Sequence, residues 1–98
     1  MADFILLMHA LPKDAAAEVD WRPYIARLQA SGHLRGGSAM GGGACFNKDG
    51  RVAGVTSHLT GFVRVEADSL GAAAALLPGN PVYEAGGTVE IRELPKTD

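Results

Sequence analysis

The feature that most limits the fold is an uninterrupted apolar run, FILLM, close to the start of the printed sequence. Side chains alternate between the two faces of a β-strand, so a run without polar interruptions fits a strand that is covered on both faces. One face would carry Phe4, Leu6 and Met8. The other would carry Ile5 and Leu7. The fold must therefore provide apolar cover on both sides of this strand.

After this strand, predicted over residues 3–9, the spacing of apolar residues becomes helical. In DAAAEVDWRPYIARLQASG they recur at i, i+3, i+4 and i+7 from Trp21, which defines one apolar helix face. Asp20 is the expected N-cap, Pro23 fits the first turn, where a missing N–H costs little, and Gly32 is the expected C-terminal stop. The sequence therefore predicts a helix that ends just before Gly32.

The remaining segments predict a hairpin, a strand, a short helix and a last strand. Residues 47–50 supply the turn of a hairpin between ACF and RVAGV. GFVRVEA (61–67) and TVEIREL (88–94) alternate apolar and charged side chains, as half-buried strands do. Between these strands, residues 68–69 are expected to cap a short helix that residues 78–79 end, and NPVYEAGG is expected to be a loop.

This order of elements predicts a ferredoxin-like βαββαβ fold of the α+β class with an added hairpin. Its four-stranded antiparallel sheet would carry two helices on one face. Residues 1–98 are expected to form a single domain, because a chain of this length has no material for a second core. Two helices cover one face only, so the face of Ile5 and Leu7 would stay open. A homodimer that packs open face against open face is the expected assembly.

Composition narrows the functional classes. The 98 residues include nine Lys or Arg, eleven Asp or Glu and one cysteine, Cys45, with a formal net charge of −2. The arginines are scattered among acidic residues, so no nucleic acid partner is expected. A single cysteine can form neither an intrachain disulfide nor a Cys-based zinc site, which suits a reducing compartment, and a cytoplasmic location is expected. The opening apolar run is too short for a membrane span or signal peptide.

Six of the thirteen glycines fall within GHLRGGSAMGGGACF, which begins at Gly32. A phosphate-binding loop would need Lys and then Ser or Thr after its GxxxxG, but Gly42 and Gly43 stand at those positions, and a hairpin rather than a helix follows. The run instead predicts a strand thinned by small residues, which lets another backbone or a bound molecule approach closely.

Candidate functional side chains are few. Histidine titrates near neutral pH, so general acid or base chemistry would fall to His9 or His58 first, and these are the candidate catalytic residues. His9 ends the first strand, and His58 lies in TSHLT, expected to be a loop or strand edge. With Tyr24 they are also the candidate ligand-binding residues; the alternatives are a structural, hydrogen-bonded His9 and a Tyr24 that only packs its helix. No two histidines have the i, i+4 spacing of a helical metal site, so neither a metal nor a cofactor is expected.

Nearly the whole chain resembles the YCII-related proteins, and within them the DGPF branch. The matching segments are FILLM, W..YIARLQASGHL..G, DGRV...T and GFVRVEADSLGAAAALLPGNPVYEAGGTVEIRE. The resemblance implies a ferredoxin-like sheet that forms a dimeric α/β barrel, in a family whose biochemical function is largely unestablished. In one branch a histidine of the first helix and an aspartate of the hairpin region are the suspected active pair.

The chain departs from that pattern at both places. Tyr24 stands where the histidine would fall, and TSHLT, residues 56–60, stands in place of the DGPF signature without an acidic residue. His9 and His58 would be the replacement pair if the fold brings them together. Two functions follow: a small dimeric module that binds a small apolar or weakly polar molecule in a cleft between sheet and partner, or a cofactor-free enzyme that uses His9 or His58 as general acid or base beside Tyr24.

Overall fold

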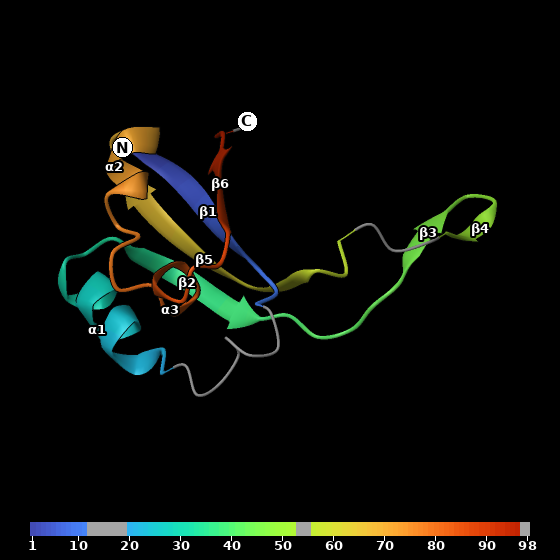
Figure 1. The fold of residues 1–98 in the computed structure, drawn as a ribbon. Helices are drawn as coiled ribbons and strands as arrows, with labels where there is room; N and C mark the ends of the chain where they lie inside the picture. Colours follow the sequence, from blue (N-terminus) through green and yellow to red (C-terminus); the bar gives the residue numbers. More distant parts are fainter. Residues whose placement is uncertain (12–19, 53–55, 97–98) are drawn as a thin grey trace.

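The computed structural model describes residues 1–11, 20–52 and 56–96 (Figure 1). Within these ranges the chain forms strands and helices in an order that matches the predicted one, with one further short helix. The elements are β1 (Ala2–His9), α1 (Arg22–Ala30), β2 (Leu34–Ala39), β3 (Cys45–Asn47), β4 (Gly50–Val52), β5 (Leu59–Ala67), α2 (Leu70–Ala74), α3 (Pro81–Glu84) and β6 (Val89–Leu94).

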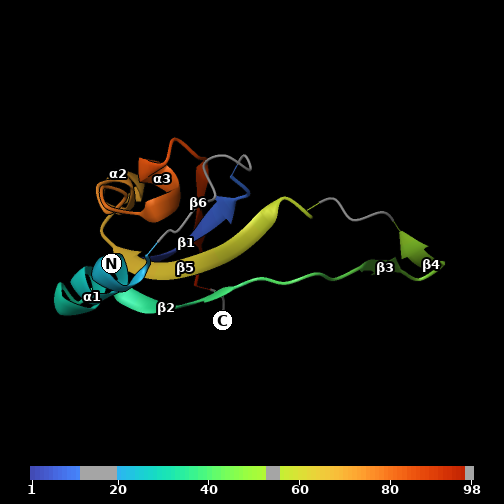
Figure 2. The same cartoon turned by 60° about the horizontal axis from the view of Figure 1, so that its bottom comes forward.

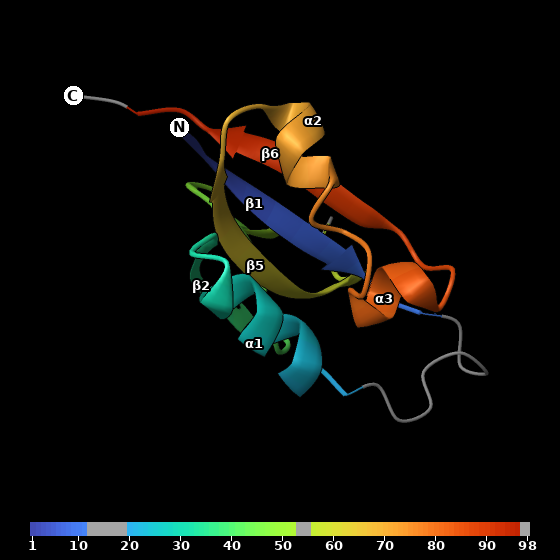
Figure 3. The same cartoon turned by 90° about the vertical axis from the view of Figure 1, so that its left-hand side faces the viewer.

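Four strands form one antiparallel sheet in the order β2-β5-β1-β6, with β1 and β5 in the centre. The three helices lie on one face of this sheet, as Figure 3 shows. This is the predicted ferredoxin-like α+β arrangement, and within the described residues the sheet is open rather than closed into a barrel. None of the helices described here is long and apolar enough to cross a membrane.

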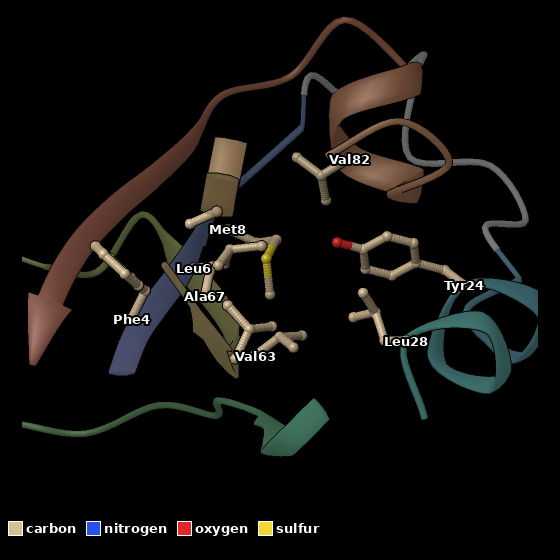
Figure 4. Close-up of a cluster of buried hydrophobic side chains, with 10 residues drawn as sticks. Phe4, Leu6, Met8, Tyr24, Leu28, Val63, Ala67 and Val82 are labelled. Atoms are coloured by element: carbon tan, nitrogen blue, oxygen red, sulfur yellow. The ribbon is translucent and has the colours of Figure 1, made fainter. Parts of the chain in front are cut away.

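The core lies between the sheet and the helices. Phe4 pairs with Val65 and Leu6 with Val63 across β1 and β5, so these side chains share the helix-covered face. Leu6 and Val65 are fully buried, and Tyr24 of α1 packs over the same cluster (Figure 4). The predicted division of the first strand into two faces is therefore confirmed: one set of its side chains is buried, and the alternate set is half-buried.

α1 starts one residue later than the sequence suggested. Trp21 is the N-cap, in an α-helical backbone conformation with no side-chain cap, so the prediction of Asp20 as N-cap is wrong. The Asp20 carboxylate instead accepts hydrogen bonds from the backbone N–H of Arg22, at 3.0 Å, and from its guanidinium. The predicted stop is confirmed: Gly32 has a φ of +80°, and its N–H donates to Gln29 in a Schellman-type ending.

The segment NPVYEAGG, expected to be a loop, contains α3. Asn80 is fully buried and caps this helix, because its Oδ1 accepts the N–H groups of Val82 (3.0 Å) and Tyr83 (3.1 Å). A four-residue helix is too short to show a helical period in the sequence.

α2 begins as predicted, with the Ser69 Oγ accepting the N–H of Ala72 at 3.1 Å. It ends at Ala74, several residues before the predicted stop at Pro78. The reason is a change of hydrogen-bond pattern, since the N–H of Leu77 donates three residues back to Ala74 and tightens the chain into turns.

The predicted hairpin is present, but it stands apart from the sheet. Among the described strands, β3 and β4 pair only with each other, and they form the end of an extended segment, residues 41–52, that we call the arm. Figures 1 and 2 show the arm running outward beyond the ends of β2 and β5, clear of the helices. The radius of gyration is 14.8 Å, whereas a compact chain of this length has about 13 Å.

The glycines of β2 have the role that the sequence predicts for small residues. Gly36 has a φ of +134° at an irregularity in the β2–β5 register, which is a conformation that favours glycine. A Cβ on Gly37 would lie 2.6 Å from the carbonyl oxygen of Phe62, so β2 and β5 approach too closely for a larger residue. Residues 41–43, in the arm, have open space around them instead.

Candidate functional site

A cavity of about 670 Å³ lies on the helix-covered side of the sheet, near the ends of β2 and β5 from which the arm leaves. It forms where α1, α3 and the sheet do not close completely against one another. Its apolar wall includes Met8, Leu11, Trp21, Ile25, Val63 and Val82. The volume falls in the range of about 300–1,000 Å³ that is typical of small-molecule sites.

Two residues with hydroxyl side chains, Ser38 and Thr60, border the cavity, but Ser38 lies opposite Phe62 and Thr60 precedes the covered-face residue Gly61, so both side chains alternate to the open face. Ser38 Oγ donates to the carbonyl oxygen of Ala39 at 2.8 Å, and Thr60 Oγ1 lies 3.5 Å from the carbonyl oxygen of Met8. No charged side chain of the described residues lines the cavity. An apolar cavity without a counter-charge disfavours an ionised ligand, because burying an unpaired charge is costly. The wall therefore suits an uncharged molecule with few polar groups.

The glycine-rich strand forms one side of this cavity. Gly36, Gly37 and Gly61 all border it, and a Cβ on Gly61 would lie 3.1 Å from the carbonyl oxygen of Ser38. This wall consequently consists of backbone atoms rather than side chains, so the strands present a thin surface to the cavity. The small residues thus serve the close pairing of β2 with β5 and leave room next to it.

Tyr24, a predicted ligand-binding residue, is buried in the core, and its hydroxyl donates to the carbonyl oxygen of Leu76 at 2.8 Å. Burial raises the pKa of the Tyr24 phenol. The ring meets Trp21 edge to face, with centroids 6.0 Å apart, and it is Trp21 rather than Tyr24 that lines the cavity. The Tyr24 hydroxyl was predicted to contact a ligand, but it is hydrogen-bonded to the backbone after α2 instead.

His9 and His58 come together at the arm end of the sheet. Their ring centroids are 4.7 Å apart in an edge-to-face arrangement, and the N–H of Ala10 donates to the carbonyl oxygen of His58. Both residues were predicted from the sequence as candidate catalytic residues. The contact between the end of β1 and the loop that carries His58 was not predicted. His9 is half-buried, whereas His58 is exposed.

Glu90 completes this group, and sequence reasoning missed it. Its Oε1 lies 3.2 Å from His9 Nε2, which brings an imidazole and a carboxylate within hydrogen-bonding reach. This hydrogen bond, helped by Arg92 at 3.4 Å, lowers the pKa of Glu90. The pairing depends on the register of β6 against β1, in which Glu90 lies opposite Leu7. No local sequence signal contains that register.

The cavity and the histidine group lie on opposite faces of the sheet. Met8 lines the cavity from the covered face, whereas His9, the next residue of β1, shares the open face with Leu7. Neither His9 nor His58 belongs to the cavity wall. In the part of the chain that the structure describes, no three His, Cys, Asp or Glu side chains are grouped so that they could hold a metal ion.

An open antiparallel sheet in this strand order, with its helices on one face, defines the ferredoxin-like class. A sequence profile that describes the YCII-related domain matches residues 4–96, and the chain therefore belongs to the YCII-related family. The fold is similar to that of 5-chloro-2-hydroxyhydroquinone dehydrochlorinase from Burkholderia phenoliruptrix AC1100 in complex with 2,5-dihydroxybenzoquinone, with a TM-score of 0.61 and 15% identity over 97% of this chain and 95% of that one. No curated protein sequence matches the chain.

Proposed function

We propose that this chain is a small, single-domain, cytoplasmic module that forms a homodimer and binds an uncharged, weakly polar small molecule in the cavity beside β2 and β5. The observation that carries the proposal is the cavity itself, about 670 Å³ with an apolar wall that no charged side chain of the described residues lines. A similarly folded enzyme is known with a small ring compound bound, which supports a small-molecule role for this fold. The sequence suggested a cleft between sheet and partner, whereas the cavity lies on the helix side.

The binding test uses Trp21, which lines the cavity and is the only tryptophan of the chain. Its fluorescence is followed while neutral phenols are added, each matched with a carboxylated analogue that is ionised at neutral pH. Neutral compounds should bind, and their ionised analogues should bind at least about tenfold more weakly. Calorimetry on the same pairs separates binding from simple quenching.

Two variants locate the binding. Ala39 lines the cavity, so Ala39→Phe should occupy part of it and weaken binding by about tenfold. Ala30, an exposed residue at the end of α1 outside the cavity wall, provides the control Ala30→Phe. Binding that Ala39→Phe leaves unchanged, or a preference for the ionised analogues, would contradict the proposed site.

The proposed dimer rests on the open face of the sheet. Ile5, Leu7 and Phe62 are only half-buried there, and the molecule is only 19 Å thick, which matches one sheet with one helix layer. Arg64 and Glu66 place both signs of charge on the same face, so a two-fold partner can oppose unlike charges. Sedimentation at micromolar concentration tests the dimer, and a chain that sediments as a folded monomer would contradict it.

A second candidate function is a cofactor-free enzyme, favoured by the group of His9, His58 and Glu90. A carboxylate that binds one imidazole nitrogen orients the ring, as general acid–base catalysis requires. Tyr24 has no part in this version, because its hydroxyl is bound to the backbone. Turnover that is lost in His9→Gln, while ligand binding at the cavity is kept, would favour the enzyme over the binding module.

A further inference from the structure

The arm is not covered by any other described part of its own chain. Among the strands of residues 1–11, 20–52 and 56–96, β3 and β4 pair only with each other, and a two-stranded hairpin is at best marginally stable in water without further packing. Phe46, in β3, has 73% of its surface exposed, the largest fraction among the exposed large hydrophobic side chains of the described residues. The views in Figures 1 and 2 agree that the arm projects away from the sheet and the helices.

The arm also continues the two strands that border the open face. β2 and β5 stay paired as far as Met40, whose N–H donates to Thr60 at 2.9 Å, and the chain then leaves the sheet as the arm. Any copy that packs on the open face must therefore lie beside the arm of the first copy. The arm reaches well past its own sheet, so in the proposed homodimer it would extend toward the second copy rather than back onto its own helices.

The open face of a second copy also has side chains that suit the arm. The described arm carries Lys48, Asp49 and Arg51, which gives it one net positive charge. At the arm end of the sheet, the open face carries the partly exposed Glu90 carboxylate, which already contacts His9 at 3.2 Å and Arg92 at 3.4 Å. The open face of a second copy thus presents an apolar surface for Phe46, from Ile5, Leu7 and Phe62, among charges of both signs that the charged residues of the arm can oppose.

We propose that the arm docks on a second copy of this chain and buries Phe46 against it. This inference rests on the proposed homodimer, and it adds a second contact region to the packing of the two open faces. Arm docking is reciprocal in a two-fold pair, so each copy both offers an arm and receives one.

The first test compares dimer dissociation constants, measured by sedimentation, for the wild-type chain and two variants. Phe46→Asp should weaken the dimer by about tenfold or more, because it removes the exposed aromatic side chain that the proposed contact would bury. Leu70→Asp is the matched control: Leu70 is 58% exposed on α2, at a helix start that tolerates an acidic residue, so it should leave the constant unchanged. Circular dichroism of each variant shows that the sheet is still folded.

The second test uses Cys45, the only cysteine of the chain, which adjoins Phe46 in β3. A benzophenone attached to Cys45 is photoactivated in a mixture of nitrogen-14 and nitrogen-15 chains, and the cross-linked peptides are identified by mass spectrometry. Peptides that join the two isotopes, between the arm and the body, are expected. Cross-links confined to single chains would overturn the inference.

The two proposals fail in different ways. A dimer whose dissociation constant is the same for wild type and Phe46→Asp would overturn the arm contact and leave the open-face dimer intact. A wild-type chain that stays monomeric would overturn both.

Discussion

The same strands form both faces of the sheet, but the helices cover only one of these faces. On β1, Leu6 is fully buried under the helices, whereas its neighbour Leu7 lies half-buried on the open face. The covered face borders an apolar cavity, and the open face carries the His9–Glu90 contact. Leu6 and Leu7 are identical side chains on opposite faces. The stability lost when each is truncated therefore measures how well its face is covered.

The largest expected effect comes from truncating this pair. Leu6→Ala should lower the free energy of unfolding by about 2–5 kcal/mol, because it leaves a cavity in a closed core. Leu7→Ala should cost clearly less when the chain is dilute, since the side chain already contacts water. Urea denaturation at low and high protein concentration measures both. Equal losses in dilute solution would show that the second face is not open.

The next effect concerns the wall that β2 gives to the cavity. Gly37→Ala should destabilise the fold by about 1–3 kcal/mol, because the new methyl group would press on the Phe62 carbonyl, a backbone atom that cannot rotate away. Gly43, in the arm, has open space around it, so Gly43→Ala should change stability by no more than about 0.5 kcal/mol. Thermal unfolding compares the two, and similar losses would contradict the distinction between strand and arm.

A smaller effect is expected at the buried hydroxyl of the covered side. Tyr24→Phe should cost about 0.5–1.5 kcal/mol, because the Leu76 carbonyl loses its hydrogen-bond donor. The pKa of Tyr24 is raised by burial, so its contribution is fully present below the unfolded value of about 10 and is lost as the pH rises through the folded-state value. Thermal unfolding of both chains in alkaline buffers measures this, and wild-type stability should fall toward that of Tyr24→Phe.

Most of the fold could be predicted because its signals are local. The alternation in β5 and β6 and the helical spacing that begins at Trp21 repeat often enough to show their period. α3 was missed because four residues show no period, and its buried cap, Asn80, looks like any turn residue in the sequence. The α1 cap was misplaced by one residue because Asp20 bonds to the helix start from outside it.

The site was less accessible, because it depends on contacts that are distant in sequence. His9 and Glu90 are 81 residues apart, and only the β1–β6 register brings them together. The cavity arises from the spacing of two helices over the sheet, to which no single motif corresponds. The sequence did indicate that small residues would permit a close approach, and Gly37 shows where this happens.

The smallest expected effect is on the open face, at the His9–Glu90 contact. The pKa of Glu90 is lowered by His9, so the stabilising contribution of its carboxylate is present above the unfolded value of about 4.3 and is lost as the pH falls through the folded-state value. Glu90→Gln should therefore flatten the acid side of the stability profile slightly, because a partly exposed pair is screened by solvent and salt.

The matched control is Glu93→Gln, an exposed position on the same strand. Melting temperatures measured between about pH 3 and 7, at low and high salt, separate the two variants. If Glu90→Gln and Glu93→Gln have the same profile, the carboxylate at Glu90 does not stabilise the fold through His9. The open face would then differ from the covered face in its exposure alone. The proposed enzyme function would also lack the carboxylate of Glu90 as the group that orients His9.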